Sequence, residues 1–582
     1  MFRTARPTSL LPLALCATAS ASQAPCELRL ASATPQLGER EGQQVDYSDG
    51  RAMLGSPERA GGGRVTLHEV VAGVWTEVAD LASPTPTSDN DRFGWAVAID
   101  GDRAVVGAPF AGTPQGFQGP GAAYVFERDA GTGTWSFVQE LQRSATQTWN
   151  DRFGFSVDMD GDLLAVGAFG DGTSAANAGA VYVFRHDGTS YVEEQKLTAS
   201  TVQTAIRLGT CVAVDGDTIV SGAPYEDVGA VSNGGAAYVF ERDLGTGLWS
   251  ETARLTSPSP QPSDFFGISA SLSGDRVVAG AEGVSGSGRA FVHERSLGAG
   301  WGLEATLAPR NPVAGLTFGQ GVRILGDRVA VNARQATVLG QAQAGEVELF
   351  ERGAGGWSYS RTVNKAAPAV LDEFGTGVVL GPDLILVGCP GDDSTGVTDA
   401  GGAYLFDLTD CDGDGVSDAC QLAGDATLDL NRNGVLDRCE AVGSTYCNPN
   451  TPNSTGLAGE VTLLGSPEVA QNDLRVTARQ LPPNAFGFFL TSTTPGSVFP
   501  VANSQGTLCI IGNIGRGAGG GIINSGALGV LQGQLDLAAL PQPTGAVAAQ
   551  PGETWHFQAW HRDAVGGQTT SNFTDAVAVT FQ

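Results

Sequence analysis

The sequence FGWAVAIDGDRAVVGAP, from Phe93 to Pro109, is the clearest copy of a phrase that the chain repeats seven times. The second residue of every copy is glycine, and no insertion falls inside the phrase. Such a period indicates a supersecondary unit that buries its apolar faces only by stacking on its neighbours. The copies open at Glu41, Phe93, Phe153, Leu208, Phe266, Phe318 and Phe374.

Each repeat predicts four β-strands. In the copy above, Val97 and Ile99 alternate with alanines, and Asp100-Gly101 then provides a hairpin turn, because both turn positions need positive φ. Residues 121–126 form a third apolar run, and a Gly-rich turn leads to an aromatic residue, Trp135, that opens a fourth strand. Four strands in each of the seven repeats predict an all-β fold with a seven-bladed β-propeller over residues 22–408.

The last repeat lacks its fourth strand, because it ends after its third strand at Phe406. Leu30 precedes Glu41 by the offset that separates the fourth-strand leucine of other repeats from the next phrase. We therefore expect residues 27–33 to complete the last blade, which leaves no open sheet edge. Cys26 and Cys411 would then flank the same hairpin end, which predicts a disulfide between them.

The first residues have the features of an export signal. Arg3 and Arg6 precede an apolar run over residues 10–17, and the small residues 19–21 offer a cleavage site, so residues 1–21 are predicted to be a signal peptide. We expect a secreted or cell-surface protein with disulfides and no transmembrane segment. The net charge of −29 argues against nucleic acid as a partner, since phosphate binding needs clustered cations.

Residues 409–442 carry two loops with the spacing of calcium ligands. In the second loop oxygen side chains occupy positions 1, 3, 5 and 9, glycine position 6 and glutamate position 12, which is the EF-hand pattern. The first loop is richer in acids but ends in Gln421. An acidic disordered linker is the alternative. The predicted Ca²⁺ ligands are Asp410, Asp412, Asp414, Val416, Asp418, Gln421, Asp429, Asn431, Asn433, Val435, Asp437 and Glu440.

The Phe-Gly and Gly-Ala-Pro ends of the phrase, as at residues 93–94 and 107–109, resemble the FG-GAP repeat of integrin α-subunit propellers and of many secreted bacterial proteins. Many members of that family hold calcium within the phrase, but here that place has only a tight turn, so calcium in the blades is not implied. Residues 410–440 resemble dockerin and thrombospondin type 3 calcium repeats. Cys420 and Cys439 occupy equivalent loop positions, which favours a bridge between them.

Residues 443–582 alternate as strands without the repeat, and about seven such runs predict a β-sandwich that Cys447 and Cys509 would cross-link. Gly515, Gly517 and Gly520 match a dinucleotide-binding spacing, but no βαβ unit surrounds them, so we expect a Gly-rich loop.

Two histidines flank a tryptophan in the same region and could suggest a metal site. Because no third ligand is evident, His556 and His561 are expected to be half-exposed strand residues.

The long connections of the repeats are predicted to gather on one face of the ring, where binding residues concentrate. We expect this face to bind an extracellular protein or glycan. The chain has no H-E-x-x-H or G-x-S-x-G motif, so an enzyme is not expected, although a polysaccharide lyase or hydrolase and a structural envelope protein are alternatives. The candidate binding residues are Phe110, Phe117, Trp149, Phe169, Tyr225, Glu226, Asp227, Asp392 and Asp393.

Overall fold

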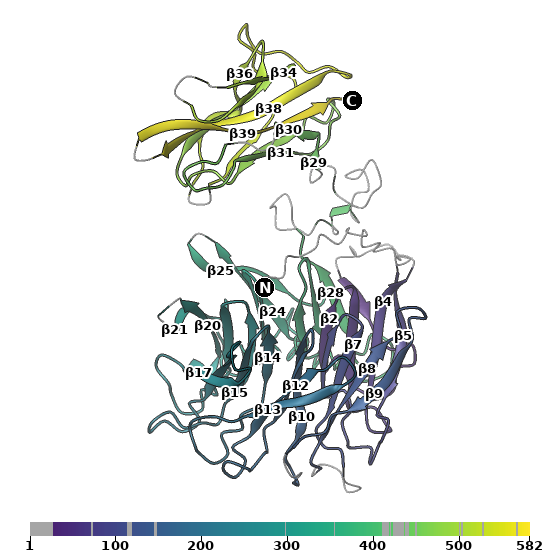
Figure 1. The fold of residues 1–582 in the computed structure, drawn as a ribbon. Coiled ribbons are helices and arrows are strands. Elements are labelled where there is room, and N and C mark those ends of the chain that lie inside the picture. Colours follow the sequence, from purple (N-terminus) through teal and green to yellow (C-terminus); the bar gives the residue numbers. More distant parts are fainter. Residues whose placement is uncertain are drawn as a thin grey trace. The chain divides into compact units, whose positions relative to one another are not determined.

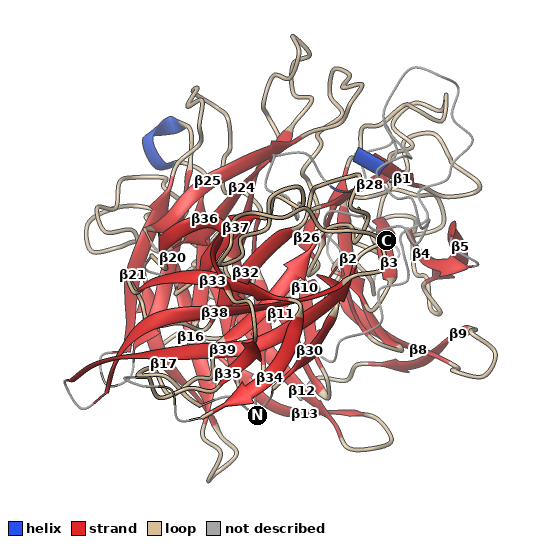
Figure 2. Ribbon diagram, turned by 90° about the horizontal axis from the view of Figure 1, so that it is seen from above, coloured by secondary structure: helices blue, strands red, loops and turns tan. Residues whose placement is uncertain are grey.

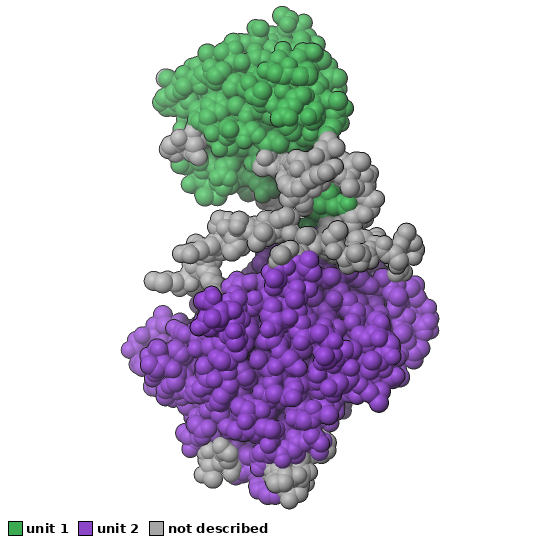
Figure 3. Space-filling view, turned by 90° about the vertical axis from the view of Figure 1, so that its right-hand side faces the viewer, with its two compact units in different colours: residues 1–14, 22–24, 409–582 green, residues 15–21, 25–408 purple. Residues whose placement is uncertain are grey.

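The structure is a computed structural model that describes most of the chain from residue 27 onward. Strands dominate it (Figure 2), and it divides between Leu408 and Thr409 into two compact units (Figure 3). The described residues are 27–582 without 72–73, 113–118, 145–147, 297, 299, 354, 410–417, 419–420, 423–435, 437–440, 448–450, 500, 502–503, 527–528 and 566–567.

The first unit consists of four-stranded antiparallel sheets, as expected for the blades of a β-propeller (Figure 1). The described residues of the first unit form seven such sheets, one for each copy of the phrase. A short 3-10 helix, η1 (Val284–Gly286), lies between strands of the fifth sheet.

The strands of the first four sheets follow the order of the chain. They are β2 (Gln44–Ser48), β3 (Arg51–Ser56), β4 (Arg64–Val71) and β5 (Val74–Ala82); β6 (Ala96–Asp100), β7 (Arg103–Ala108), β8 (Ala122–Arg128) and β9 (Trp135–Glu140); β10 (Phe153–Asp160), β11 (Leu163–Ala168), β12 (Ala180–His186) and β13 (Tyr191–Leu197); β14 (Val212–Asp215), β15 (Thr218–Ala223), β16 (Ala236–Arg242) and β17 (Trp249–Leu255).

The remaining sheets of this unit are built in the same way, except that the seventh takes its fourth strand from the start of the described chain. They are β18 (Ser269–Ser273), β19 (Arg276–Ala281), β20 (Arg289–Ser296) and β21 (Gly300–Leu307); β22 (Val322–Leu325), β23 (Arg328–Ala333), β24 (Glu346–Gly353) and β25 (Gly356–Val363); β26 (Val378–Leu380), β27 (Leu384–Gly388), β28 (Ala403–Asp407) and β1 (Glu27–Leu30).

Strand β1 occupies the place where the sequence predicts the missing strand. It pairs antiparallel with β28, with Glu27 opposite Phe406 and Leu30 opposite Ala403. Leu30 is buried and packs with Leu54 of the first sheet and Leu386 of the seventh. The last sheet is therefore completed by the first described strand, and the two sheets share a core.

The glycines of the phrase allow neighbouring sheets to meet backbone to backbone. A Cβ at Gly107, before the end of β7, would overlap the carbonyl oxygen of Gly154 in the next repeat, and Gly388 stands in the same relation to Gly42. The last repeat thus docks on the first through the contact that joins consecutive repeats. This close approach explains why the phrase needs glycine at both ends.

The aspartate just before the glycine caps the neighbouring sheet. The predicted turn at Asp100-Gly101 lies one residue further on, since Asp100 pairs with Arg103 and only Gly101 has a positive φ. The N–H of Gly161 donates to the carboxylate of Asp100 over 2.7 Å, and Gly216 donates to Asp160 over 2.8 Å. The first strand of each sheet has a free edge, and these side chains satisfy backbone donors there. The turn residues therefore also connect the sheets.

The second unit contains two larger sheets and a two-stranded one among its described residues. The sheet orders are β29-β31-β32-β37, β30-β39-β38-β33-β36 and β34-β35. The strands are β29 (Ala441–Val442), β30 (Ser444–Tyr446), β31 (Glu460–Leu464), β32 (Arg475–Arg479), β33 (Phe486–Ser492), β34 (Thr494–Val498), β35 (Leu508–Ile511), β36 (Gly515–Asn524), β37 (Leu531–Gln534), β38 (Thr554–Val565) and β39 (Gln568–Thr580).

One hydrophobic core joins the two larger sheets of this unit. Leu463 and Val476 of one sheet pack in the same cluster as Phe489 and Phe557 of the other, and all four are buried. The disulfide expected between Cys447 and Cys509 is present. Cys211 and Cys389, both in the first unit, are free thiols.

Two expectations for the second unit were wrong. The Gly-rich segment that contains Gly515 is strand β36, and it pairs with β33. Its glycines also allow the backbones of β36 and β37 to approach closely, at Gly519 and Gly533. His556 and His561 are buried rather than half-exposed, and this burial lowers the pKa of both imidazoles.

Most of the predicted calcium segment lies outside the described residues. Of the predicted ligands, only Asp418 and Gln421 are described, and the N–H of Asp418 donates to the Thr409 carbonyl over 2.9 Å. Cys26, Cys411, Cys420 and Cys439 also lie outside the described residues, so the two bridges predicted for them stay predictions.

Candidate binding face and central cavity

The long connections of consecutive repeats lie at the same ends of their strands. The segment after the second strand runs beside the segment before the first, so that Phe110 N–H donates to the Asp91 carbonyl and Tyr225 N–H to the Ile206 carbonyl. The Asp-Gly turns lie at the opposite ends of these strands. The side chains that follow the second strand and those that precede the first strand therefore lie at the same end of each sheet, which we call the long-loop face.

Eight half-buried side chains from the second to the fifth repeat touch one another in sequence on this face. We call them the aromatic–arginine row. The contacts run from Arg152 to Phe110 (4.3 Å), Trp95 (5.9 Å), Phe155 (5.4 Å), Phe169 (4.5 Å), Arg207 (5.5 Å), Tyr225 (4.2 Å) and Phe265 (5.4 Å), each distance measured from the preceding side chain.

The row is made by equivalent positions of the repeat. Arg152, Arg207 and Phe265 directly precede the phrase, and each has a positive φ near 60° that turns the chain into the first strand. Trp95 and Phe155 are the third residues of their phrases. The third residue is aromatic only in these two copies, because the other copies have Gln43, Thr210, Ile268, Gln320 or Thr376 there.

The two arginines of the row have no carboxylate partner among the described residues, although the chain has 62 acidic residues and 33 basic ones. The Arg152 guanidinium donates to the Asn150 side chain over 3.1 Å, and its Nη1 is buried without a partner. Burial lowers the pKa of Arg152, with no neighbouring acid to offset it. The Arg207 guanidinium lies over the rings of Phe169 and Tyr225.

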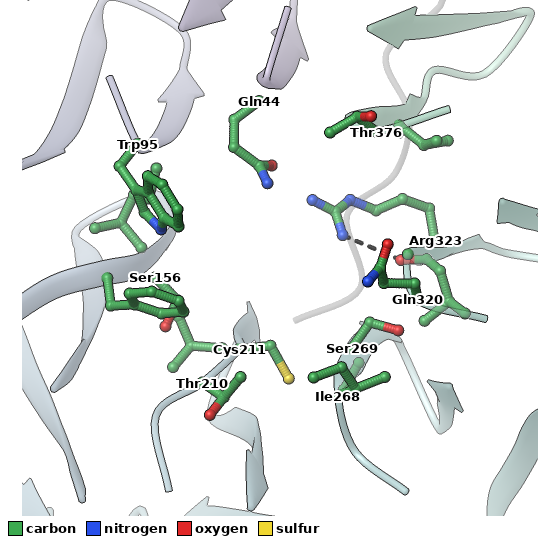
Figure 4. A pocket seen from close by; sticks show the side chains of 18 of the residues that line it. Gln44, Trp95, Ser156, Thr210, Cys211, Ile268, Ser269, Gln320, Arg323 and Thr376 are labelled. Atoms are coloured by element: carbon green, nitrogen blue, oxygen red, sulfur yellow. Dashed lines mark hydrogen bonds between the residues drawn. The ribbon is translucent and has the colours of Figure 1, made fainter. Parts of the chain in front are cut away.

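A cavity of about 270 Å³ lies where the first strands of all seven sheets converge (Figure 4). Trp95 and Phe155 belong both to its lining and to the aromatic–arginine row, so the row continues into the cavity. The polar side chains of the lining are one cation and several neutral groups. The neutral polar side chains are Gln43, Gln44, Ser156, Thr210, Ser269, Gln320 and Thr376.

Arg323 of β22 is the cation of the lining, and Figure 4 shows its guanidinium pointing into the cavity. Its one described hydrogen bond is from Nη1 to the Val322 carbonyl, over 3.0 Å. A guanidinium has five N–H donors, so most of them are free for a ligand. The side-chain amides of Gln43 and Gln44 likewise make no hydrogen bond to another described residue.

Asp46 and Asp158 are the next inward-facing residues toward the Asp-Gly turns. Burial raises the pKa of Asp46 to about 6, and burial together with the charge of Asp46 raises the pKa of Asp158 to about 7, although Arg323 opposes both shifts. Each carboxyl accepts a backbone N–H from a neighbouring sheet, Ile99 over 2.7 Å and Val214 over 2.6 Å. Within the described residues neither forms an ion pair with Arg323.

The structure separates the predicted binding residues into two groups. Trp149 is 62% exposed, Asp227 and Asp393 are exposed, and Phe110, Phe169 and Tyr225 belong to the aromatic–arginine row. Phe117 lies outside the described residues.

Glu226 and Asp392 form the second group, because both are buried and fully engaged inside their sheets. Glu226 accepts hydrogen bonds from Tyr238 and Arg254. Asp392 accepts them from Lys365 over 2.6 Å and Arg29 over 2.6 Å. These carboxylates are bound by side chains around their own sheets and are buried away from the face.

Arg152, Arg207, Trp95 and Arg323 were not singled out from the sequence. Their common signal is a position in the repeat, since the residue before the phrase and the inward-facing residues of its first half point to the face and the axis. A comparison of those positions across all copies would have found them.

Comparison with known proteins supports the repeat. The FG-GAP repeat family matches residues 75–126, 135–184, 191–240 and 249–293, so four FG-GAP repeats are found in this chain. No curated protein matches the chain.

Solved structures that resemble the chain have low identity. A putative 6-phosphogluconolactonase from Bacteroides fragilis NCTC 9343 is 11% identical with a TM-score of 0.39, and covers 60% of this chain and 93% of its own. Saccharomyces cerevisiae Sqt1 is 10% identical with a TM-score of 0.36, covering 67% and 100%. The Pseudomonas aeruginosa periplasmic gluconolactonase PpgL is 15% identical with a TM-score of 0.38, covering 57% and 86%.

The described part of the chain contains no helix that is both long enough and apolar enough to cross a membrane.

Proposed function

We propose that this protein is an exported recognition scaffold. In this proposal a closed seven-bladed propeller binds an extracellular protein or glycan on its long-loop face, and a C-terminal β-sandwich follows a calcium-binding segment. The signal peptide expected over residues 1–21 would direct export. The protein would act by binding and not as an enzyme.

The observation that carries the proposal is the aromatic–arginine row. Aromatic rings and guanidinium groups are enriched at protein interfaces, since the rings offer a large contact area and the guanidinium groups add directed hydrogen bonds. Neither arginine of the row pairs with a carboxylate among the described residues. A partner that supplies hydrogen-bond acceptors would satisfy their free N–H groups.

The test is binding of the full-length exported protein to arrays of extracellular glycans and proteins, followed by titration of each hit. Arg207→Gln should weaken binding about tenfold or more, because it removes a charge-assisted contact. Arg310→Gln is the matched control, since Arg310 stacks on Tyr359 at 5.0 Å outside the row. Equal binding by both variants would place the partner elsewhere.

Two further outcomes would count against a recognition role. Release of unsaturated or shortened sugars from a bound polysaccharide would favour the enzyme alternative. No saturable binding to any probe would favour a structural protein of the cell envelope.

The calcium proposal has separate support in the spacing of the loop over residues 429–440. Carboxylate and amide oxygens at those positions suit the oxygen coordination of Ca²⁺. We propose that the ion orders the acidic segment over residues 409–442, because coordination would offset the repulsion among its carboxylates.

Calorimetric titration of the EDTA-treated full-length protein with Ca²⁺ tests this segment. Saturable heat is expected, and the double variant Asp429→Ala, Glu440→Ala should remove the tighter component. Asp536→Ala, a change at an acid of the second unit, serves as the control. Absence of heat in the unmodified protein would reject the site.

A further inference from the structure

We infer that the central cavity binds one carboxylate-bearing sugar residue at the end of a saccharide chain, with its carboxylate paired to Arg323. This inference rests on the proposed function and specifies the ligand of the same face. It follows from the charge, the size and the lining of the cavity.

The positive charge of Arg323 in the lining favours an anionic ligand. Arg323 points into the cavity and is bound by one backbone carbonyl, so its remaining donors face the space where a ligand would lie. Guanidinium groups bind carboxylates through paired N–H···O contacts. The carboxyls of Asp46 and Asp158 are already engaged by backbone N–H groups of neighbouring sheets and form no described ion pair with Arg323.

The neutral lining suits hydroxyl groups. The side-chain amides of Gln43 and Gln44 have no described partner, and the hydroxyls of Ser156, Thr210 and Ser269 donate to backbone carbonyls, which leaves their lone pairs as acceptors. A ring of amides and hydroxyls can exchange hydrogen bonds with a polyhydroxylated molecule at several points. A peptide would instead need a lengthwise groove with backbone donors.

Size and rings complete the case. A volume of about 270 Å³ lies just below the range of about 300–1,000 Å³ that is typical of ligand sites, so the cavity suits a single sugar residue and not a long segment. Trp95 and Phe155 offer apolar surface at the edge of the cavity, against which the C–H groups of a sugar ring can pack. The rest of the saccharide would extend along the aromatic–arginine row.

The experiment is calorimetric titration of the full-length protein with oligosaccharides that end in glucuronate or galacturonate, and with matched oligosaccharides that end in glucose or galactose. We expect the acidic ends to bind about ten- to a hundredfold more tightly, as a charge-assisted contact implies. Arg323→Gln should abolish this preference and leave the affinity for neutral ends unchanged. Arg323→Lys, which keeps the charge, should retain part of the preference.

Arg328→Gln, a change on the neighbouring strand β23 where the arginine meets Glu351 at 3.3 Å, is the matched control and should bind like the unmodified protein. Trp95→Ala provides a second variant in case Arg323→Gln fails to fold, and it should weaken both acidic and neutral ends. The thermal unfolding midpoint of every variant establishes that it is folded.

The outcomes separate this inference from the proposed function. Equal affinity for acidic and neutral ends, or an acid preference that survives Arg323→Gln, would overturn the inference while the recognition role stands. Binding of a protein but of no saccharide would also overturn the inference alone. Absence of any partner for the full-length protein would overturn both.

Discussion

At the residue scale, the phrase is a device for bringing backbones together. Gly107 is buried where a Cβ would overlap the next repeat, so only a residue without a side chain allows the two backbones to meet there. Gly302 of β21 is exposed and has open space around its Cα. Comparing alanine substitutions at these two glycines distinguishes the free-energy cost of disturbing the inter-sheet contact from the cost of replacing any strand glycine.

Gly107→Ala is expected to destabilise the first unit by about 3 kcal/mol or more, because the added methyl group must push two backbones apart. Gly302→Ala should change the free energy of unfolding by less than about 0.5 kcal/mol, as exposed substitutions usually do. Urea unfolding followed by tryptophan fluorescence measures both. Equal effects of the two substitutions would mean that the glycine contact does not hold the sheets together.

The buried carboxylate of Asp392 gives a pH prediction. Burial alone would raise its pKa, but hydrogen bonds from Lys365, Ser394 and Arg29 outweigh burial and lower the pKa to about 2. A lowered pKa means that the ionised form stabilises the folded state above the unfolded pKa of about 3.8, and that this stabilisation is lost as the pH falls toward 2.

Asp392→Asn should therefore cost about 2 kcal/mol at pH 7, and the difference from the unmodified protein should shrink between pH 4 and pH 2. The substitution Asp393→Asn, at an exposed neighbour, is the control. Guanidinium unfolding at a series of pH values is the measurement. A cost that is constant down to pH 2 would contradict the role of the ionised carboxylate.

At the element scale, strand β1 links the seventh sheet to the first. It adds the outer strand of the seventh sheet, and its Arg29 reaches Asp392 at 2.6 Å while Leu30 enters the core shared with the first sheet. The contact between Arg29 and Asp392 joins residues that lie 363 positions apart in the sequence. Closure therefore depends on a strand of only four residues.

Leu30→Ala should lower the free energy of unfolding by about 2–4 kcal/mol, since it leaves a cavity in a shared core. Leu37→Ala, at a side chain that is 77% exposed, should have almost no effect. Hydrogen exchange followed by mass spectrometry should show the loss first in residues 403–407, the partner strand. Faster exchange spread evenly over all sheets would argue against closure by β1.

The sequence predicted the repeated elements well because the strands alternate apolar residues and six of the seven hairpins have glycine at the turn. The turn itself was misplaced by one residue, since Asp100 pairs with Arg103 and only Gly101 has a positive φ. The sequence even indicated β1, since the repeat left a gap that only this segment could fill. Strand β36 was missed because glycines have no side chains to alternate, and its pairing depends on a close approach to β37 that only the fold brings about.

At the scale of the whole molecule, the candidate site was harder to predict than the fold. The rings and arginines of the row come from repeats about sixty residues apart, and no local motif links them. Glu226 and Asp392 were predicted to bind a partner because they lie on long connections. Both are instead buried, and each accepts a hydrogen bond from a tyrosine of the third strand of its sheet. Position within the repeat, rather than loop membership, decides which side chains reach the face.

The two units differ in how they are stabilised, and the difference can be tested. The first unit holds free Cys211 and Cys389, whereas the second has a disulfide between Cys447 and Cys509, which lie 62 residues apart. Closing a loop of that length lowers the entropy of the unfolded chain, which corresponds to about 4 kcal/mol of stability. The double variant Cys447→Ser, Cys509→Ser should therefore speed hydrogen exchange throughout β30–β39 and leave residues 27–408 unchanged, whereas Cys211→Ser should leave the second unit unchanged. Loss of protection in the first unit of the double variant would show that its stability depends on the second.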